Sequence, residues 1–156
     1  MKAKIISRSV KQTLEIGRAI AGYLSRGDIV CLRGELGSGK TCLAKGIAWG
    51  LGIKPSRVVS PTFILIHRHD GGRMPLYHFD LYRLESPRDI LDLGYEEYFY
   101  GDGLSVIEWP ERLKYLLPKD ALEIKLSIKG AKQRLFEFSG ASGRKLREKI
   151  YEDIRH

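Results

Sequence analysis

The sequence predicts an α/β fold of three layers, built on a mixed, mostly parallel central sheet with an antiparallel extension. Two observations lead to this prediction. Residues 28–53 run from a short apolar strand into a glycine-rich turn and then into a helix, which is typical of parallel sheets flanked by helices. Later segments alternate apolar and polar residues and are joined by short turns, which indicates antiparallel hairpins.

The turn within residues 28–53 contains a phosphate-binding motif. Gly34, Gly39, Lys40 and Thr41 fill the fixed positions of the pattern G-x-x-x-x-G-K-S/T. Its glycines permit positive φ, so that successive N–H groups can point at an anion. In this motif the lysine reaches the β- and γ-phosphates and the hydroxyl ligates Mg²⁺. Because a strand precedes the motif and a helix follows it, we expect a P-loop NTPase-like fold with the phosphates at a helix N-terminus.

Bulk properties predict one domain over residues 1–156. The chain is long enough for one core, and 43% hydrophobic with 29% charged residues is an ordinary globular composition. No apolar run approaches the ~20 residues of a membrane span, and the N-terminus lacks a signal peptide, so we expect a cytoplasmic protein without a membrane partner. The net charge of +8 fits a nucleic-acid or acidic protein partner, or solubility alone.

The other elements follow from periodicity and turn residues. Ser9 is expected to cap the first helix and Gly27 to end it, while Pro110 opens a turn or helix. The final helix is amphipathic and basic. Strands are expected at 2–7, 29–32, 63–69, 74–84, 104–108, 121–129 and 133–140, and helices at 10–27, 87–93, 95–100 and 142–156, besides the helix that follows the loop.

A nucleotide site of this kind also needs a carboxylate close to Mg²⁺. Glu108 closes an apolar strand and Asp80 lies in the predicted hairpin, so both are candidates at the carboxyl edge of the sheet. From the residues alone, Glu108 could instead cap the next turn, and Asp80 could pair with Arg73 or Arg83. The loop 60–62 could direct a hydroxyl at the γ-phosphate, or it could be only a turn before a strand.

Cysteine and histidine residues offer two weaker hypotheses. Cys31 and Cys42 fit buried thiols in a reducing compartment better than a disulfide, which would tie up the loop. His67 and His69 share one face of a strand and His78 lies on its partner, so a metal site is conceivable. Nothing supplies a closed set of four Cys or His ligands, and a polar strand face is the favoured interpretation.

Five segments of the chain stand out by their order and spacing, namely 34-GELGSGKT-41, 60-SPTF-63, 78-HFDLYR-83, 93-LGYEEYF-99 and 108-EWPER-112. In this order and spacing they resemble the bacterial TsaE (YjeE) proteins, and the resemblance covers roughly residues 9–140. Members of this family are small ATPases required for threonylcarbamoyladenosine at position 37 of tRNAs that read codons beginning with A. They work with the TsaB and TsaD proteins, and their ATP hydrolysis supports repeated turnover of TsaD.

The resemblance implies roles for individual residues. Thr41, Glu108 and Asp80 would hold Mg²⁺, and Lys40 would join the two carboxylates as a catalytic residue. It also implies TsaD and TsaB as partners and contact with tRNA only through their complex; we expect a monomer when the protein is alone. The basic tail after residue 141 departs from the family pattern, and its role stays open. Residues expected to contact ATP are Gly34, Glu35, Leu36, Gly37, Ser38, Gly39, Lys40, Thr41, Cys42, Thr62 and Trp109, with Thr13 and Arg134 as outer contacts.

Three other functions share some of these features. A small-molecule kinase has the same loop, but its usual arginine-rich lid has no counterpart between Glu108 and Pro118. A GTPase would need an N-K-x-D element, which this sequence lacks. A basic nucleic-acid-binding module regulated by nucleotide would fit the charge. No arginine is placed by a known motif to contact the γ-phosphate; Arg83 and Arg112 are the nearest candidates, and a partner could supply that contact instead.

Overall fold

The computed structural model describes residues 3–59, 65–140, 148 and 152, and it contains a single seven-stranded sheet. The predicted strand at 63–69 lies partly outside these residues, and the predicted helix at 142–156 lies almost wholly outside them. The elements in chain order are β1 (Ala3–Ser7), α1 (Val10–Ala21), β2 (Ile29–Arg33), α2 (Lys40–Gly50), the short 3₁₀ helix η1 (Pro55–Arg57), β3 (Ile66–His69), β4 (Leu76–Asp80), α3 (Pro87–Asp92), α4 (Tyr95–Phe99), β5 (Leu104–Glu108), the 3₁₀ segment η2 (Pro110–Leu116), β6 (Leu122–Ile128) and β7 (Arg134–Ser139).

The sheet is mixed, as predicted, with the strand order β1-β7-β6-β2-β5-β4-β3. Its four central strands, β6, β2, β5 and β4, pair in parallel. The outer pairs β1–β7, β6–β7 and β3–β4 are antiparallel. The antiparallel extension therefore occurs at both edges of the sheet, whereas the carboxyl ends of β2, β4 and β5 meet at one edge in the middle.

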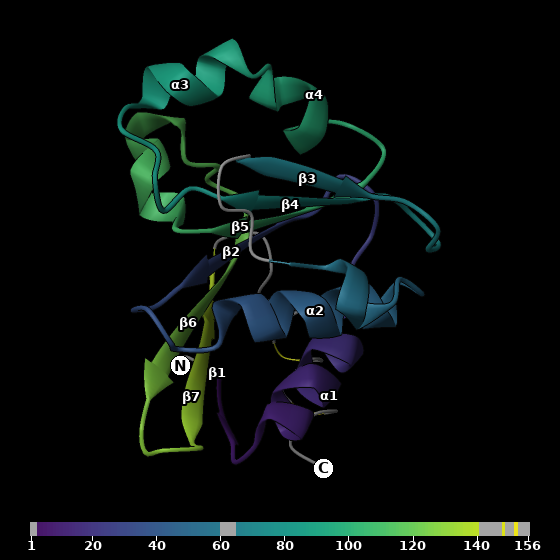
Figure 1. The fold of residues 1–156 in the computed structure, drawn as a ribbon, viewed down its shortest axis with the longest axis vertical. Coiled ribbons are helices and arrows are strands. Elements are labelled where there is room, and N and C mark those ends of the chain that lie inside the picture. Colours follow the sequence, from purple (N-terminus) through teal and green to yellow (C-terminus); the bar gives the residue numbers. More distant parts are fainter. Residues whose placement is uncertain (1–2, 60–64, 141–147, 149–151, 153–156) are drawn as a thin grey trace.

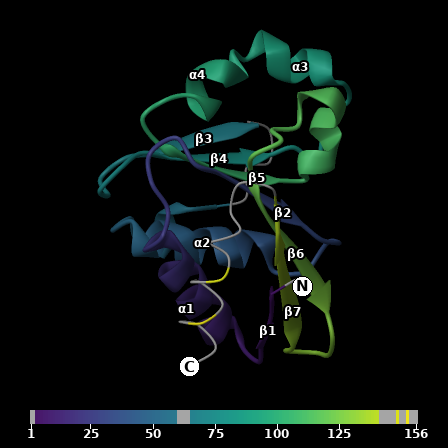
Figure 2. The ribbon, with the colours of Figure 1, turned by 180° about the vertical axis from the view of Figure 1, so that it is seen from behind.

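Helices cover both faces of the sheet and give three layers. Figure 1 shows α1 and α2 on one side of the strands and α3 and α4 on the other, and Figure 2 shows the same arrangement from behind. Alternate residues of the central strands β2, β4 and β5 face two separate cores, because successive side chains of a pleated strand point to opposite faces. In β2, for example, Val30 and Leu32 join the core under α1 and α2, while Cys31 joins the core under α3, α4 and η2.

The helices α1 and α2 pack against each other at three glycines. A Cβ atom on Gly17 of α1 would lie 2.7 Å from the carbonyl oxygen of Leu43, and one on Gly46 of α2 would lie 2.5 Å from that of Leu14. Gly50 is equally restricted, with Arg18 O at 2.6 Å. The backbones of the two helices are therefore in direct contact, which fixes α2 and the loop before it relative to α1.

No helix in the described part of the chain is long and apolar enough to cross a membrane.

The first helix ends earlier than predicted. Ser9 caps it by accepting the N–H of Gln12, but α1 stops at Ala21 instead of reaching Gly27. The cause lies far away in the sequence. The guanidinium of Arg73 donates to the carbonyl oxygen of Ala21, the last residue of α1, and to that of Leu24 in the turn that follows. The N–H groups of Tyr23 and Leu24 donate to the carbonyl oxygens of Ile20 and Ala21, so the last carbonyl groups of the helix find partners without further helical turns. Gly27 instead takes a positive φ of 88° in the turn before β2.

The strand predicted over 74–84 is also shorter, since β4 covers only Leu76–Asp80. Beyond it the chain turns, because the Asp80 carboxylate accepts the backbone N–H of Tyr82 at 3.1 Å. A side chain that bonds to the backbone two residues on is typical of a turn. The predicted hairpin of 121–129 and 133–140 is present as β6 and β7. Pro87 opens α3 behind a capping box formed by Ser86 and Asp89.

Candidate active site

The phosphate-binding motif forms the connection between β2 and α2. Gly34, Gly37 and Gly39 have φ values of +156°, +80° and +103°, as the motif predicts. Close approach adds a second reason for glycine at position 34, where a Cβ would lie 2.5 Å from the Ser38 Oγ atom. Gly39 is the N-cap of α2, and its carbonyl accepts the N–H of Leu43 at 2.9 Å. The N–H groups of the first turn before Leu43 have no acceptor within the helix, which favours an anion at this end.

Lys40 is held inside this loop. Its side chain is 5% exposed, its ammonium donates to the carbonyl oxygen of Gly34, and the Nζ atom lies 3.5 Å from the centre of the Trp109 ring. Burial lowers the pKa of Lys40, while the carboxylates of Glu108, Glu111 and Asp80 oppose this effect. The ammonium is thus partly desolvated next to the loop, where its attraction to an anion is stronger than in water.

Glu108 connects the loop helix to the sheet. This last residue of β5 is 2% exposed, and its two carboxylate oxygens lie 3.0 and 3.1 Å from the Thr41 hydroxyl, which donates to them. On its other side, Oε2 lies 2.5 Å from Nε2 of His78, a completely buried residue of β4. The alternative, that Glu108 caps the next turn, does not account for these contacts, because both of its partners belong to other elements.

Asp80 lies beside Glu108, because the two residues are register partners in the parallel β4–β5 ladder. Neighbouring register partners place their side chains on the same face of a sheet. The backbone reinforces this arrangement, since the N–H of Leu81 donates to the Glu108 carbonyl oxygen at 3.1 Å. Arg73, one of the partners considered for Asp80, lies at the other end of β4 and contacts the end of α1. The structure therefore brings together Lys40, Thr41, Asp80, Glu108 and Trp109.

The predicted outer contacts have different surroundings. Arg134 of β7 reaches across to the loop, where one of its guanidinium nitrogens donates to the Gly37 carbonyl oxygen at 3.1 Å. Thr13 of α1 is 4% exposed, and its hydroxyl lies 2.7 Å from that of Ser7. Cys42 is half-buried rather than fully buried, and its thiol contacts the Val10 carbonyl oxygen at 3.8 Å. Both cysteines are free, and only Cys31 is fully buried. Nucleotide contacts by Thr13 and Arg134 stay predictions.

Some predicted features lie outside the described residues or are not gathered at the loop. The loop 60–62, with Thr62, falls outside the described residues. Arg83 and Arg112 are both exposed. The three histidines are close, with the rings of His67 and His69 6.0 Å apart, but no group of three or more His, Cys, Asp or Glu side chains within the described ranges is arranged to hold a metal ion.

Sequence reasoning missed two contacts of this site. Trp109 packs on Tyr82, with ring centres 5.1 Å apart, and an open groove of about 800 Å³ runs past both rings and the exposed Leu36 of the loop. The bond between His78 and Glu108 was also missed. Its signal was available, because His78 precedes Asp80 by two residues and so shares its strand face, but the parallel pairing of β4 with β5 was needed to recognise it.

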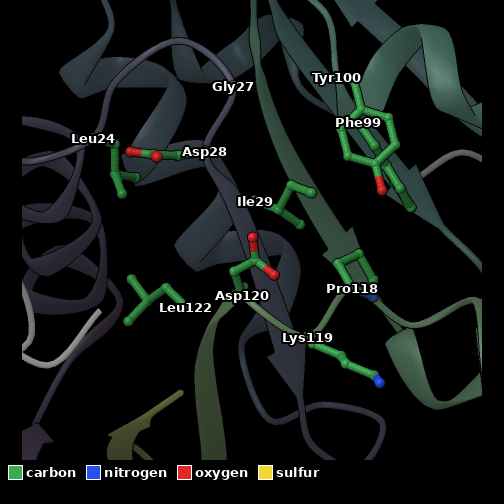
Figure 3. A pocket seen from close by; sticks show the side chains of 10 residues that line it. All are labelled: Leu24, Gly27, Asp28, Ile29, Phe99, Tyr100, Pro118, Lys119, Asp120 and Leu122. Carbon is green, nitrogen blue, oxygen red and sulfur yellow. The ribbon is translucent and has the colours of Figure 1, made fainter. Parts of the chain in front are cut away.

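A second hollow of about 410 Å³ lies at the amino ends of β2 and β6, away from the loop. Figure 3 shows Asp28, Lys119 and Asp120 around it, with the Phe99 and Tyr100 rings on one side. None of the residues predicted to act on a nucleotide lines it. The chemistry that the sequence predicts is therefore concentrated at the carboxyl edge of the sheet.

Comparison with known proteins gives a consistent result. Residues 7–136 match the family model described as threonylcarbamoyl adenosine biosynthesis protein TsaE. The chain is 43% identical over 125 residues to a tRNA threonylcarbamoyladenosine biosynthesis protein TsaE of Treponema pallidum, which covers 80% of this chain and 91% of that protein. The corresponding Bacillus subtilis protein is 39% identical over 135 residues, covering 86% and 83%.

The fold leads to the same group of proteins. The crystal structure of Bacillus subtilis YdiB matches with a TM-score of 0.79 and 32% identity, and the match covers 99% of this chain and 95% of that one. The family model spans nearly all of the described α/β domain, including the loop, β4 and β5. The chain thus belongs to the TsaE family of threonylcarbamoyl adenosine biosynthesis proteins.

Proposed function

We propose that this protein is an Mg²⁺-dependent ATPase that acts with TsaB and TsaD in the formation of threonylcarbamoyladenosine at position 37 of tRNAs reading codons that begin with A. Membership of the TsaE family supports the pathway. The observation that carries the chemistry is the bond from the Thr41 hydroxyl of the loop helix to Glu108, beside Asp80. It joins the phosphate-binding motif to two carboxylates at one edge of the sheet.

Binding of ATP is assigned to the loop. Successive N–H groups from Gly37 to Thr41, at the start of α2, receive the phosphate oxygens, and Lys40 exchanges its bond with the Gly34 carbonyl for a bond to phosphate. Arg134 already lies over Gly37 and is suitably placed to extend the loop toward the outer part of the nucleotide. The contacts of Thr62 and Thr13 rest on the family resemblance alone.

The donor set suits Mg²⁺, because Thr41, Glu108 and Asp80 offer only oxygen atoms, which this hard cation prefers. Two carboxylates and one hydroxyl are too few for a complete protein cage. This is the usual condition of a magnesium site that also uses substrate phosphates and water. Mg²⁺ would neutralise charge that develops on the β- and γ-phosphates.

The chain's own groups then divide the chemistry. Lys40 stabilises negative charge on the phosphates in a partly desolvated position. Glu108 and Asp80 orient the attacking water and accept its proton at a carboxylate oxygen. Trp109 covers the ammonium of Lys40 and limits its access to solvent.

We assign the protein to the cytoplasm as a monomer that meets tRNA only through the complex.

The proposal is tested by reconstituting the modification on a tRNA transcript with purified TsaB, TsaD and this protein, supplied with an activated threonylcarbamoyl donor. Wild-type protein with ATP and Mg²⁺ is expected to sustain many rounds of product formation, whereas Glu108→Ala is not. A substrate-activity screen of the free protein with small phosphate acceptors is the counter-test, because efficient phosphoryl transfer to such a molecule would favour the kinase alternative. Product formation that continues unchanged without this protein would contradict the proposed role.

A further inference from the structure

Within the described part of the chain, His78 makes one side-chain hydrogen bond, and its partner is Glu108. The residue lies in the middle of β4, is completely buried, and its Nε2 atom is 2.5 Å from the Glu108 Oε2 atom. Because a carboxylate oxygen accepts hydrogen bonds, Nε2 must carry the hydrogen. The other ring nitrogen, Nδ1, is buried and has no hydrogen-bond partner within the described residues.

This arrangement is costly for a residue whose role is only to fill the core. A buried polar atom without a partner is destabilising, and an apolar side chain of similar size would avoid that cost. His69 of β3 is also buried and also has a ring nitrogen without a partner within the described residues, so burial alone does not distinguish His78. What distinguishes His78 is the 2.5 Å contact of its Nε2 atom with the Glu108 carboxylate. The ring of His78 is therefore better explained by what it does to Glu108 than by packing.

The two donors of Glu108 approach from different elements. The Thr41 hydroxyl comes from α2 and contacts both carboxylate oxygens, while His78 comes from β4 and contacts Oε2 alone. If the Thr41 hydroxyl turns to another ligand, His78 remains the donor that fixes the orientation of the carboxylate. Oε1 is then left facing the loop helix.

We propose that His78 is a positioning residue that holds the Glu108 carboxylate in place through an Nε2–H···Oε2 hydrogen bond, so that Oε1 is presented to a divalent cation at Thr41. The inference deepens the proposed function and rests on it. Partners that orient metal-binding carboxylates typically change metal affinity by 10–100-fold when they are removed. His78 should therefore act on the response to Mg²⁺ and not on the binding of nucleotide itself.

Three substitutions separate the donor from the bulk of the ring. His78→Gln keeps a donor close to the position of Nε2, His78→Asn offers one only near Nδ1, and His78→Leu removes it. His67→Gln is the matched control, because His67 is the register partner of His78 but makes no recorded contact with Glu108. A Trp49→Phe background leaves Trp109 as the single tryptophan of the chain.

The readout is the Mg²⁺ concentration that gives half of the Trp109 fluorescence change in protein bound to a non-hydrolysable ATP analogue. We expect His78→Leu and His78→Asn to raise it by about tenfold or more, and His78→Gln and the control to stay within about threefold of the parent. Affinity for the analogue in EDTA should be unchanged in all four variants. If His78→Leu fails to fold, the Gln and Asn variants still decide the question.

A second measurement needs no metal. Nitrogen NMR of the imidazole in the free protein should find the hydrogen of His78 on Nε2, and a ring without that hydrogen would overturn the inference. An unchanged Mg²⁺ response in His78→Asn and His78→Leu would overturn it as well, while the proposed function would stand. A parent protein that neither binds the analogue nor responds to Mg²⁺ would overturn both.

Discussion

Lys40 should contribute more to nucleotide affinity than any other side chain of the site. The residue is 5% exposed and its ammonium lies against the loop, so a bound phosphate would pair with a charge that is already partly desolvated. Loss of one partner of such a pair costs about 2–5 kcal/mol. At ~1.4 kcal/mol per tenfold, Lys40→Ala should weaken ATP binding by roughly 30-fold or more in calorimetry. Near wild-type affinity would remove the loop from the nucleotide site.

Glu108 and Asp80 should affect hydrolysis more than binding. Most ground-state affinity is expected from the loop N–H groups and Lys40, whereas the carboxylates act on the metal and the water. Glu108→Ala should keep ATP affinity within about an order of magnitude but slow partner-stimulated hydrolysis by roughly 10²–10⁴, the usual loss with a general base. Glu96→Ala removes the same charge at an exposed position of α4 and serves as the control. Unchanged hydrolysis in both Glu108→Ala and Asp80→Ala would refute the assignment.

Cys31 makes the stability of the fold depend on pH in the alkaline range. Burial raises the pKa of its thiol from 9.0 to about 12. Between these two values the folded state keeps a proton that the unfolded state loses. The contribution of Cys31 to the free energy of unfolding is therefore fully present below pH 9 and is lost progressively between pH 9 and 12. The free energy of unfolding should fall by about 1.4 kcal/mol by pH 10 for this reason. Urea unfolding at pH 8 and pH 10 should show a loss of stability that is larger by this amount in the parent than in Cys31→Val, and an equal loss in both proteins would contradict the prediction.

At the scale of elements, the contact of α1 with α2 should tolerate almost no added volume. Gly17→Ala would place a Cβ 2.7 Å from Leu43 O and 2.8 Å from the backbone of Ile47, so the helices must separate. Overpacking of this kind costs typically ~1–3 kcal/mol. Gly22→Ala at the end of the same helix meets only the Ala19 carbonyl oxygen at 3.3 Å and is the control. Denaturant unfolding should show a clear loss of stability for the first variant and a small change for the second.

Elements that are specified by nearby residues could be predicted from the sequence, and elements that depend on distant contacts could not. The loop, β2, α2 and β5 were predicted well because the motif, the apolar runs and the glycines specify them within a few residues of sequence. The end of α1 was not, since it depends on Arg73, which lies 52 residues from Ala21. The distribution of antiparallel pairs to both edges likewise depends on the pairing of β1 with β7, for which no local pattern exists.

Within the site, residue types could be predicted but not their contacts. Strand ends identified Glu108 and Asp80 as candidates, and the register of β4 with β5 explains why they are neighbours. The contacts of Lys40 with Trp109, and of His78 with Glu108, required the three-dimensional arrangement. Trp109 has a positive φ of 59°, a conformation rare in residues other than glycine, and its sequence position gave no sign of it.

At the scale of the molecule, the candidate site lies at one edge of the sheet beside an open groove. The groove beside the loop passes Leu36, which is 64% exposed, and Tyr82, which is 42% exposed. Arg83 and Arg112, the two arginines considered for the γ-phosphate, are exposed. A contact on the γ-phosphate from another protein would complete such a site, and an arginine in that role is worth about 10³–10⁵ in rate.

The rate of ATP hydrolysis with and without TsaB and TsaD together is the most direct test of the proposed function. The free protein should bind ATP and hydrolyse it slowly, and the pair should raise the rate by roughly 10³-fold or more, as expected when a partner supplies a missing γ-phosphate contact. Glu108→Ala should abolish the stimulated rate. A free protein that hydrolyses ATP as fast as the assembled complex, or stimulation that persists in Glu108→Ala, would contradict this account.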